Sequence, residues 1–358
     1  MYEACGVIHL HSTYSDGSAD IPQIISCAQK NGLDFVILTD HDNLRALHAG
    51  WEGYHSGVML LCGYEMTPEK NHYLVIGTDR LVSDNGGPAE FVPKVKAIPA
   101  LGFIAHPDHV GASYFGVGCF NWTHWEVDGF TGLGIWDLMT DWQERMTNAW
   151  QGIKGVVNPL GHIRGPRAIT LSRFDQLNLS RRVVGIGEVD NHGAKIWALF
   201  FRLTIFPYRF ALGTVHNHLL LSEPLTGDFT QDKRTILDIL KQGRLYVSMD
   251  AFAPAEGFRF WGKLPSGNTI DMGDRAQFDS QIAFQVQPPP SMPEKRLQIK
   301  LLCSGDLVAE HSGEPFTYRA KTPGVYRVEI YLAKKWSRRS LPWIFSNPIT
   351  LTEGRAIR

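Results

Sequence analysis

Residues 7–41 read VIHLHSTYSDGSADIPQIISCAQKNGLDFVILTDH, and this stretch decides the fold class. Its opening residues, 7–10, predict a strand. Asp20 stands in an N-cap position, apolar residues recur at helical spacing through Ala28, and Gly32 is placed to end the helix. The apolar run FVILT from Phe35 predicts the next buried strand. The stretch therefore predicts a strand, a helix and a second strand in succession.

The same alternation continues along much of the chain. The segments LLCGYEM, HYLVIG, GFIAH and RRVVGIG each read as a strand that runs into a polar residue or a glycine. This repetition predicts the α/β class, with a largely parallel sheet or a barrel. One segment departs from it: GIWDLMTDWQERMTNAW, residues 134–150, has the spacing of a single amphipathic helix.

The pattern changes near residue 254. Beyond it, segments such as QIAFQV, LQIKLL, VYRVEIYL and NPITLT alternate apolar and polar residues, and Pro/Gly turns separate them. No helix is expected there. We therefore predict two domains, an α/β domain over residues 1–253 and an all-β sandwich over residues 254–358.

Composition narrows the classes of function. The 358 residues carry 35 Lys and Arg against 36 Asp and Glu, a net charge of −1, which argues against binding a long nucleic acid. The 5 cysteines are odd in number and contain no C-x-x-C pair, so neither a disulfide framework nor a thiolate zinc site is indicated. The first residues lack a signal-peptide pattern, which together with the cysteines predicts a cytoplasmic protein.

The longest apolar stretch does not predict a membrane span. Residues 196–212 are interrupted by Arg202, Pro207 and Arg209, so they are expected to form buried core or a loop.

Histidines and carboxylates follow the predicted strands. In His9-Leu10-His11 a period of two places both imidazoles on one face, which suits the binding of one cation. Gly17 allows a tight turn after Asp16. Because barrel strands deliver functional residues to one rim, we expect a shared metal site. Its predicted ligands are His9, His11, Asp16, His41, Glu65, His72, His106, Asp190 and His192.

As an ordered set, these motifs resemble the polymerase and histidinol phosphatase (PHP) family of metal-dependent phosphoesterases. The resemblance covers roughly residues 1–251, and one departure is Val189, where the family usually has a small polar residue. It implies a distorted barrel of seven βα units, two or three divalent metals at the strand ends, and Glu65 as a bridging ligand. The C-terminal strands resemble the sandwich of free-standing members, which favours a hydrolase over a polymerase subunit.

The ligand types themselves indicate a reaction. Three carboxylates and neutral imidazoles carry a charge of about −3, so two or three divalent ions leave a site of about +1 to +3 that attracts anions. Paired ions can share a hydroxide and stabilise both oxygens of an in-line displacement. We therefore expect hydrolysis of a small phosphorylated substrate, such as a nucleotide or sugar phosphate. Ligands without thiolate suit Mn, Fe or Zn.

Further roles are assigned by residue type. Arg164 and Arg167 in GHIRGPR are predicted to bind the phosphate, and His216 or His218 in TVHNH to act as the general acid. Asp40 is grouped with the catalytic residues because a carboxylate beside His41 could orient that imidazole. A basic run around Trp336 is interpreted as a charged hairpin tip, or as a grip for a nucleotide: Lys334, Lys335, Arg338 and Arg339.

Two alternatives stay open. A nuclease-type phosphodiesterase would use the same ligands, although the near-neutral charge weakens it for long substrates. A silent metal-binding scaffold with a binding sandwich would require damaged ligands, whereas all the motif positions carry competent side chains. No membrane partner is expected, and the sequence leaves the oligomeric state undetermined.

Overall fold

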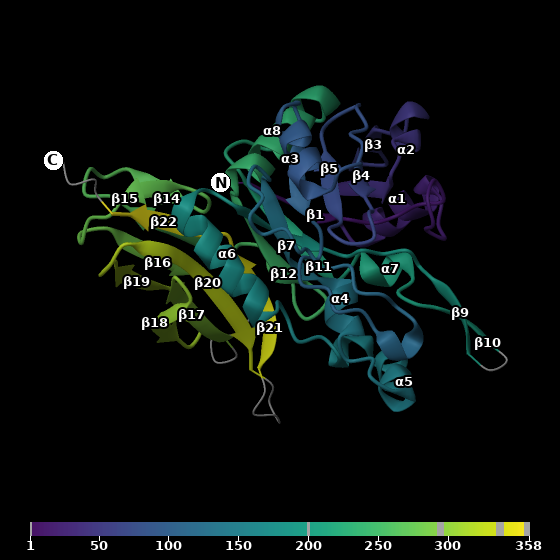
Figure 1. Cartoon of the computed structure of the whole chain (residues 1–358). Helices are drawn as coiled ribbons and strands as arrows, with labels where there is room; N and C mark the ends of the chain where they lie inside the picture. Colours follow the sequence, from purple (N-terminus) through teal and green to yellow (C-terminus); the bar gives the residue numbers. More distant parts are fainter. Residues whose placement is uncertain (1, 199–200, 292–296, 334–339, 354–358) are drawn as a thin grey trace.

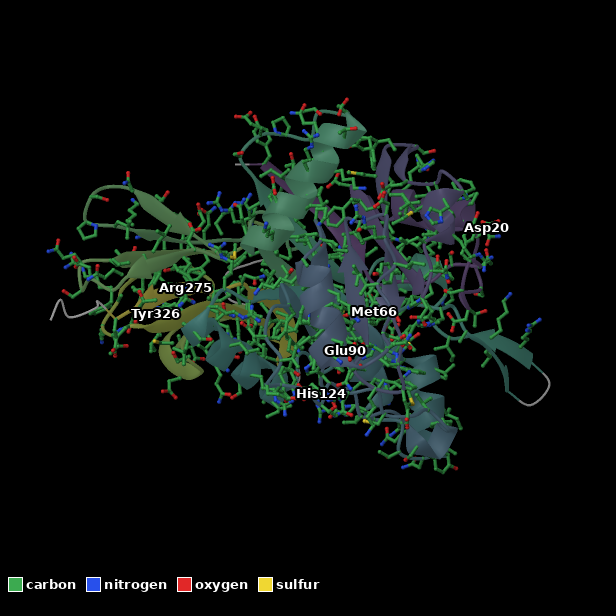
Figure 2. The ribbon with its side chains drawn as sticks, turned by 45° about the horizontal axis from the view of Figure 1, so that its top comes forward. Asp20, Met66, Glu90, His124, Arg275 and Tyr326 are labelled. Carbon is green, nitrogen blue, oxygen red and sulfur yellow. The ribbon has the colours of Figure 1, made fainter. Side chains whose placement is uncertain are left out.

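The structure is a computed structural model that describes residues 2–198, 201–291, 297–333 and 340–353. Figure 1 shows a β-rich C-terminal part beside an N-terminal part in which helices surround the strands. In Figure 2, Arg275 and Tyr326 lie among the C-terminal strands, and Met66 and Glu90 lie in the N-terminal part. The chain is therefore organised as an α/β part followed by a β part.

The N-terminal elements alternate between strands and helices. The first of them are β1 (Tyr2–Ile8), α1 (Ile21–Lys30), β2 (Phe35–His41), α2 (Arg45–His48), β3 (Gly53–His55), β4 (Val58–Met66), β5 (Tyr73–Ile76), α3 (Pro88–Lys96), β6 (Leu101–Ile104) and η1 (Ser113–Phe115). They continue with β7 (Gly132–Asp137), α4 (Leu138–Gln143), α5 (Ala149–Val157), η2 (Pro159–Gly161), α6 (Ala168–Ser180), β8 (Val184–Glu188), β9 (Lys195–Ala198), β10 (Phe201–Thr204), α7 (Tyr208–Ala211), β11 (Val215–Leu221), α8 (Phe229–Gln242) and β12 (Leu245–Met249).

The C-terminal elements are all strands in the part that the structure describes. They are β13 (Arg259–Lys263), β14 (Thr269–Asp271), β15 (Arg275–Gln277), β16 (Ala283–Gln287), β17 (Leu297–Cys303), β18 (Asp306–His311), β19 (Phe316–Arg319), β20 (Gly324–Leu332), β21 (Leu341–Ser346) and β22 (Ile349–Thr352). The prediction of a β-rich C-terminal region is confirmed.

Local sequence explains the first helix. The Asp20 side chain accepts a hydrogen bond from the Gln23 backbone N–H, and the Gln23 side chain accepts one from the Asp20 N–H, which completes a capping box. The helix buries Ile21, Ile24, Ile25 and Ala28 on one face. Gly32 then takes a φ of 68°, a conformation that favours glycine. The predicted start and end of this helix are confirmed.

The sheet is mixed, so the prediction of a largely parallel sheet is wrong in part. Strands β1, β2 and β4 pair in parallel, as do β6, β7 and β8. Strand β5 is antiparallel to both β4 and β6, and β11 is antiparallel to both β1 and β12. The turn between β4 and β5 is too short for the crossover that a parallel pair requires, which explains that reversal.

Strand β8 returns to the end of β1. The Val189 N–H donates to the Ile8 carbonyl at 3.2 Å, and the His11 N–H donates to the Asn191 carbonyl at 3.1 Å. Leu10 and Asn191 form an isolated parallel bridge. These few bonds take the place of a continuous ladder between the two strands, so the predicted seven-unit barrel is not confirmed. The contact nevertheless brings the first and last ligand motifs together.

The segment 134–150 is not the single helix that its spacing predicts. Its first residues belong to β7, which pairs with β8, and Asp137 then caps α4 by accepting from the Thr140 N–H. Asn148 caps α5 in the same way by accepting from the Gln151 N–H. Each capping side chain marks the start of a new helix, so the segment is divided into a strand and two helices. Amphipathic spacing alone does not show where such a helix begins.

The C-terminal strands form two packed layers. Strand β21 pairs with β12, so the main sheet continues into the C-terminal part, while β14, β13, β16 and β19 form a second sheet. Phe284 of β16 lies against Tyr326 of β20, with ring centroids 4.5 Å apart, and both belong to one buried cluster. Nothing in this arrangement fixes the predicted boundary at residue 254, which stays a prediction.

The remaining expectations concern residues 196–212, the cysteines, the basic run and membrane-spanning helices. The described part of 196–212 forms β9 and β10, which pair in antiparallel fashion, and then α7, so the expectation of buried core or a loop is wrong in part. All 5 cysteines lie in the described part and are unpaired. The basic run at 334–339 lies outside the described residues. Among the helices that the structure describes, none is long and apolar enough to cross a membrane.

Candidate metal centre

The predicted ligands lie where strands end or begin at one rim. His41 and Glu65 lie near the ends of β2 and β4, and these two residues are register partners in the parallel ladder. His72 comes just before β5, and because β5 runs antiparallel to β4 its start lies beside the end of β4. The remaining ligands follow β1, β6 and β8: His9, His11, Asp16, His106, Asp190 and His192.

Glu65 lies at the centre of the group and is 1% exposed. Its Oε2 is 3.1 Å from His9 Nε2, 3.4 Å from His11 Nε2 and 3.2 Å from His41 Nδ1. Its Oε1 is 2.9 Å from His72 Nδ1 and 3.3 Å from His106 Nε2. The two carboxylate oxygens therefore face two different sets of imidazoles.

Two aspartates complete the arrangement. Asp190 Oδ1 is 3.3 Å from the Nε2 atoms of both His9 and His11. Asp16 Oδ1 is 3.4 Å from the Nε2 atoms of both His41 and His192, and those two nitrogens are 3.2 Å apart. The ligand atoms thus form three overlapping groups, namely His9, His11, Glu65 and Asp190; Glu65, His72 and His106; and His11, Asp16, His41 and His192.

The hydrogen bonding of these side chains fits bound cations. His9 Nδ1 lies 2.9 Å from Glu188 Oε1, and since a carboxylate only accepts, the proton is on Nδ1. His9 Nε2 is therefore the nitrogen that faces the oxygens of Glu65 and Asp190 and is placed to bind a cation. Among the described residues, His9 Nε2, Glu65 Oε2 and His41 Nδ1 are buried atoms that have no hydrogen-bond partner. Oxygen and nitrogen atoms that face one another at these distances need a proton or a metal cation between them, and one divalent ion satisfies several such atoms at once.

The spacing of these atoms also fits. Two ligand atoms that each lie about 2.1 Å from a metal are about 3.0–3.4 Å apart at angles of 90–110°. The separations of Glu65 Oε2 from His9, His11 and His41, 3.1–3.4 Å, fall in that range.

Without a metal, protons on the imidazoles balance part of the negative charge of the carboxylates. Burial lowers the pKa of His106, but its hydrogen bond to Glu65 and the nearby Asp190 carboxylate outweigh burial and raise it to about 9. Burial raises the pKa of Glu65, yet the surrounding imidazoles, His9 above all, hold it well below its usual range. Glu65 is therefore ionised and attracts cations.

Residues 8–96 match the PHP domain family. This segment belongs to that family. The resemblance drawn from the motifs is thus confirmed by an independent comparison, and the match includes the ligands from His9 to His72. The candidate ligands His106, Asp190 and His192 lie beyond it, and the fold brings them beside the candidate ligands that the match includes.

Comparison with solved structures finds distant likenesses. A two-domain protein containing a predicted PHP-like metal-dependent phosphoesterase, from Bacteroides vulgatus, is 14% identical, with a TM-score of 0.42 over 96% of this chain and 95% of that chain. A candidate metal-dependent phosphoesterase from Bifidobacterium adolescentis is 16% identical, with a TM-score of 0.32 over 57% of this chain and 94% of that chain.

An amidohydrolase from Chromobacterium violaceum, with bound sulfate and no metal, is 11% identical, with a TM-score of 0.32 over 52% of this chain and 87% of that chain. These scores are too low to assign an activity to this chain. No curated protein matches the sequence.

Backbone geometry at the PHP ligands is unusual. His9, His106 and Asp190 have φ values of 70°, 26° and 43°, although none of them is a glycine. Strand β1 runs over Tyr2–Ile8, so the predicted strand over residues 7–10 begins and ends too late. His9 and His11 still reach the same oxygens because the turned backbone at His9 redirects its side chain. Such strained conformations are concentrated at functional sites.

The sequence prediction missed two carboxylates. Glu188, at the end of β8, contacts His9 through Oε1 and accepts from the His106 backbone N–H through Oε2 at 2.9 Å. Asp137, at the end of β7, is buried, and burial together with Asp190 and Glu188 raises its pKa to about 7. Glu188 and Asp137 each stand at the end of a strand. A strand-end position identified Glu65 in the sequence, so it could have identified these two carboxylates as well.

Asp40 does not contact the metal ligands in the way that the sequence predicts. Its carboxylate accepts from the Ser12 N–H at 2.7 Å, from the Ser12 hydroxyl at 2.8 Å and from the Ser15 hydroxyl at 2.6 Å. These bonds fix the turn that carries Asp16. Asp40 therefore positions a ligand by holding its loop rather than by orienting the imidazole of His41.

The structure does not bring His216 and His218 to the PHP cluster. Both lie on β11, which runs antiparallel to β1 and pairs His218 with Cys5. That register places His218 opposite the middle of β1, and both imidazoles lie with Cys5 and Asp250 rather than with the ligands that follow β1. The antiparallel pairing, which the sequence did not predict, is the reason that these histidines do not serve the cluster as general acids.

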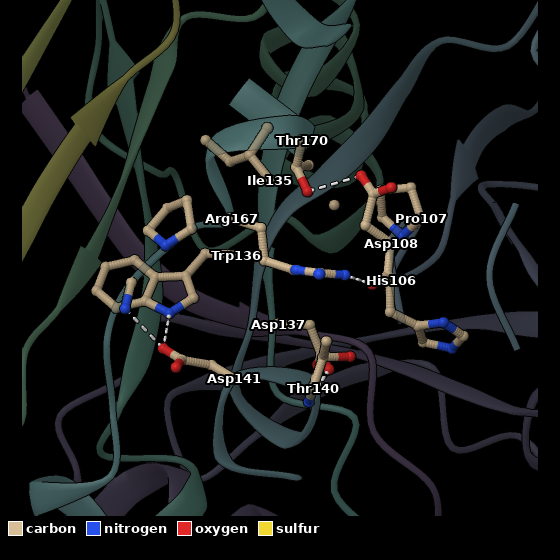
Figure 3. A pocket seen from close by; sticks show the side chains of 13 residues that line it. His106, Pro107, Asp108, Ile135, Trp136, Asp137, Thr140, Asp141, Arg167 and Thr170 are labelled. Carbon is tan, nitrogen blue, oxygen red and sulfur yellow. Dashed lines mark hydrogen bonds between the residues drawn. The ribbon is translucent and has the colours of Figure 1, made fainter. Parts of the chain in front are cut away.

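The two predicted phosphate-binding arginines have different positions. Arg167 extends into a small pocket of about 20 Å³ lined also by His106 and Asp137, and its guanidinium donates to the Asp108 carbonyl (Figure 3). The Arg164 guanidinium donates to the Gly161 and Ile163 carbonyls of its own loop. Arg167 is therefore the arginine placed beside a PHP ligand.

Proposed function

We propose that this chain is a divalent-metal-dependent phosphoesterase that acts on a small phosphorylated molecule. The observation that carries the proposal is the convergence of nine imidazole and carboxylate side chains into three overlapping groups, with buried lone pairs that face one another. Such a site concentrates positive charge once ions are bound and attracts an anionic ester.

The three groups would hold two or three ions, and Mn, Fe or Zn suit their nitrogen and oxygen ligands. When bound, such ions supply a hydroxide near neutral pH and polarise a phosphoryl oxygen. Glu65 would be shared between ions because its two oxygens face different imidazoles. Glu188 holds His9 in the tautomer that leaves Nε2 free to bind a metal.

Arg167 is our proposed phosphate-binding residue. Its guanidinium reaches the pocket wall formed by His106 and Asp108 and also pairs with Glu144 at 3.2 Å. A planar guanidinium can bind two phosphoryl oxygens at once, which favours arginine for this role.

An apolar pocket near the cluster supports a substrate with an apolar leaving group. The pocket has a volume of about 690 Å³, and its lining includes Met139, Trp142, Met146, Ile153, Leu203 and Ile205. Gln143 on its wall lies 2.9 Å from His109 Nε2, and the His109 ring lies 5.4 Å from that of His106. Such a lining favours an aryl or similarly apolar ester over a long polyanion.

Contacts between strands support two proposals about the fold. We propose that the bonds between the ends of β1 and β8 close the N-terminal strands into the distorted PHP-type barrel. We also propose that residues 254–358 form a sandwich domain, because the strands of two sheets share one buried cluster.

The first experiment compares ester hydrolysis by the wild-type protein and by Glu65→Gln after reconstitution with manganese. Nitrophenyl phosphate should be hydrolysed by the wild type, and the variant should lose at least about 100-fold in kcat/KM because its central ligand is neutral. Glu69→Gln, an exposed change in the loop that follows β4, is the matched control. Full activity of Glu65→Gln would overturn the proposal.

The same assay separates the alternatives. A faster reaction with bis-nitrophenyl phosphate than with the monoester would favour the phosphodiesterase. Stoichiometric metal binding without hydrolysis of either ester would favour the silent scaffold.

A further inference from the structure

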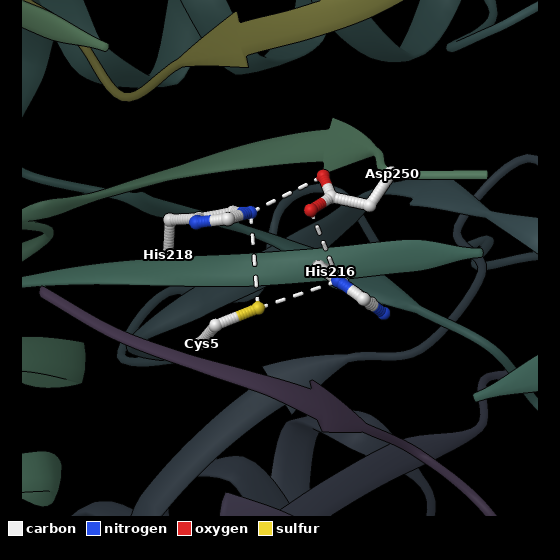
Figure 4. A group of neighbouring side chains, drawn as sticks. All are labelled: Cys5, His216, His218 and Asp250. Atoms are coloured by element: carbon white, nitrogen blue, oxygen red, sulfur yellow. Dashed lines mark hydrogen bonds and ion pairs between the residues drawn. The ribbon is translucent and has the colours of Figure 1, made fainter. Parts of the chain in front are cut away.

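A second group of metal-binding side chains lies apart from the PHP ligands. It consists of Cys5 on β1, His216 and His218 on β11, and Asp250, which follows β12. Figure 4 shows the four side chains pointing toward a common centre. His216 and His218 are almost fully buried, at 4% and 2% exposed. Neither the PHP site nor the proposed reaction uses these residues.

The ligand atoms of this group are close together. Cys5 Sγ is 3.3 Å from His216 Nδ1 and 3.8 Å from His218 Nε2. The Asp250 oxygens lie 3.4 Å from His216 Nδ1 and 3.2 Å from His218 Nε2. Each imidazole therefore directs one nitrogen toward both the sulfur and the carboxylate.

The outer nitrogens of both imidazoles have partners that fix the tautomers. His216 Nε2 lies 2.8 Å from the Leu212 carbonyl, and His218 Nδ1 lies 2.7 Å from Glu3 Oε1. Carbonyl and carboxylate oxygens only accept, so these nitrogens carry the protons. The inner nitrogens, His216 Nδ1 and His218 Nε2, are then free to bind a metal, which is the arrangement typical of metal-bound histidine.

The geometry argues against a nucleophilic cysteine. In a catalytic triad the nucleophile and the carboxylate contact opposite nitrogens of the histidine. Here Cys5 and Asp250 contact the same nitrogen of His216, and the other nitrogen faces a backbone carbonyl. Glu3 lies at the opposite nitrogen of His218 from Cys5, but the sulfur is 3.8 Å from His218 Nε2 and shares that nitrogen with Asp250, which lies closer at 3.2 Å. A shared nitrogen, sulfur and oxygen centre is what a cation requires.

We propose that Cys5, His216, His218 and Asp250 bind one zinc ion at a structural site. Zinc with bonds of about 2.3 Å to sulfur and about 2.0–2.1 Å to nitrogen or oxygen holds tetrahedral ligands about 3.4–3.6 Å apart. The observed separations of 3.2–3.8 Å surround those values. A thiolate and a carboxylate also neutralise Zn²⁺, so the buried site carries no net charge.

The position of this zinc site suggests what it does. It connects β1 and β11 to the end of β12, where the chain passes to the C-terminal strands. Glu3, which orients His218, also accepts from the Tyr246 hydroxyl and from the Arg259 guanidinium at 2.6 Å each. The ion therefore stabilises the junction between the two parts of the chain and leaves no open position for substrate.

Cobalt substitution tests the proposal directly. Tetrahedral Co²⁺ bound to a thiolate gives a charge-transfer band in the near ultraviolet, and the PHP cluster has no cysteine with which to produce one. We expect the cobalt-loaded wild-type protein to show this band and Cys5→Ser to lose it. Cys27→Ser, which also changes a half-buried thiol, should keep it. The Glu65→Gln variant should keep it too, whether or not the chain is a phosphoesterase.

Two outcomes would overturn the proposal. One is the absence of a thiolate band in wild-type protein that binds cobalt at the PHP cluster. The other is persistence of the band in Cys5→Ser. Because Cys5→Ser can fail to fold, Asp250→Asn provides a second variant that keeps the thiol and should shift the visible cobalt spectrum. Metal analysis should also find one zinc per chain fewer in Cys5→Ser than in Cys27→Ser.

Discussion

At the scale of single residues, Glu188 is expected to have a large effect on metal binding although it is not among the candidate ligands. It contacts His9 and the His106 backbone, so it fixes two ligands at once. Glu188→Gln should lower metal affinity by about 10–100-fold, a loss typical of partners that orient ligands. Competition with a chromophoric chelator measures this loss.

Two further variants test that explanation. A Cβ at Gly134 would lie 1.4 Å from Glu188 Oε2, so Gly134→Ala should displace the carboxylate and weaken metal binding in the same way. Glu126→Gln, an exposed carboxylate change, should leave affinity unaltered. Wild-type affinity in both Glu188→Gln and Gly134→Ala would show that Glu188 does not hold the ligands.

His106 predicts how metal binding depends on pH. Its pKa rises from 6.5 to about 9 in the metal-free fold, where burial is outweighed by Glu65 and Asp190. The proton stabilises the metal-free fold fully below the ordinary pKa, and this contribution is lost as pH rises through about 9. A metal must displace that proton, so affinity should rise with pH up to about 9.

Calorimetric titration with manganese, which a thiolate site does not favour, in buffers of different ionisation enthalpy measures the protons released at the PHP cluster. Release should occur at pH 8 and decrease above the pKa of His106. Binding at pH 8 without proton release would contradict this linkage.

At the scale of elements, a buried ion pair joins α6 to the C-terminal sheet. The Arg327 guanidinium on β20 contacts both Asp175 oxygens on α6, at 2.8 and 3.1 Å, and also pairs with Glu329. Figure 1 shows α6 lying across β20. Arg327→Leu leaves two buried carboxylates without their cation and should lower the free energy of unfolding by about 3–5 kcal/mol.

Denaturant unfolding measures this effect, and Arg319→Leu on exposed β19 is the control. A change within about 0.5 kcal/mol for Arg327→Leu, as at ordinary surface sites, would mean that the ion pair does not stabilise the junction.

At the scale of the whole molecule, the PHP ligands come from segments spread along most of the N-terminal part. Metal that binds only the folded chain should therefore stabilise the entire fold, by about 4 kcal/mol when the free ion is at 1,000 times its Kd. Removing metal with a strong chelator should lower the melting temperature, and adding manganese or zinc should restore it.

Manganese should have a much smaller effect on the melting temperature of Glu65→Gln, because its central ligand is impaired. An identical melting temperature for wild type with and without chelator would show that the ions do not bind the native state preferentially.

The sequence by itself was enough to predict the candidate ligands that the structure brings together. His41 and Glu65 stand at or near the ends of buried strands, and this position can be recognised from neighbouring residues in the sequence. Functional residues at such strand ends commonly share one rim. The capping box at Asp20 was predictable for the same reason, since its bonds span three residues. Hydrogen bonds between residues so close in the sequence are specified by the local sequence itself.

Tertiary structure decided which of the other candidate residues meet. The antiparallel pairing of β11 with β1 placed His218 beside Cys5, 213 residues away, and away from the PHP ligands. Glu188 likewise met His9 only because β8 returns to β1. Strand pairing between distant segments depends on the packing of the whole sheet, and the spacing of residues along the chain carries no record of it.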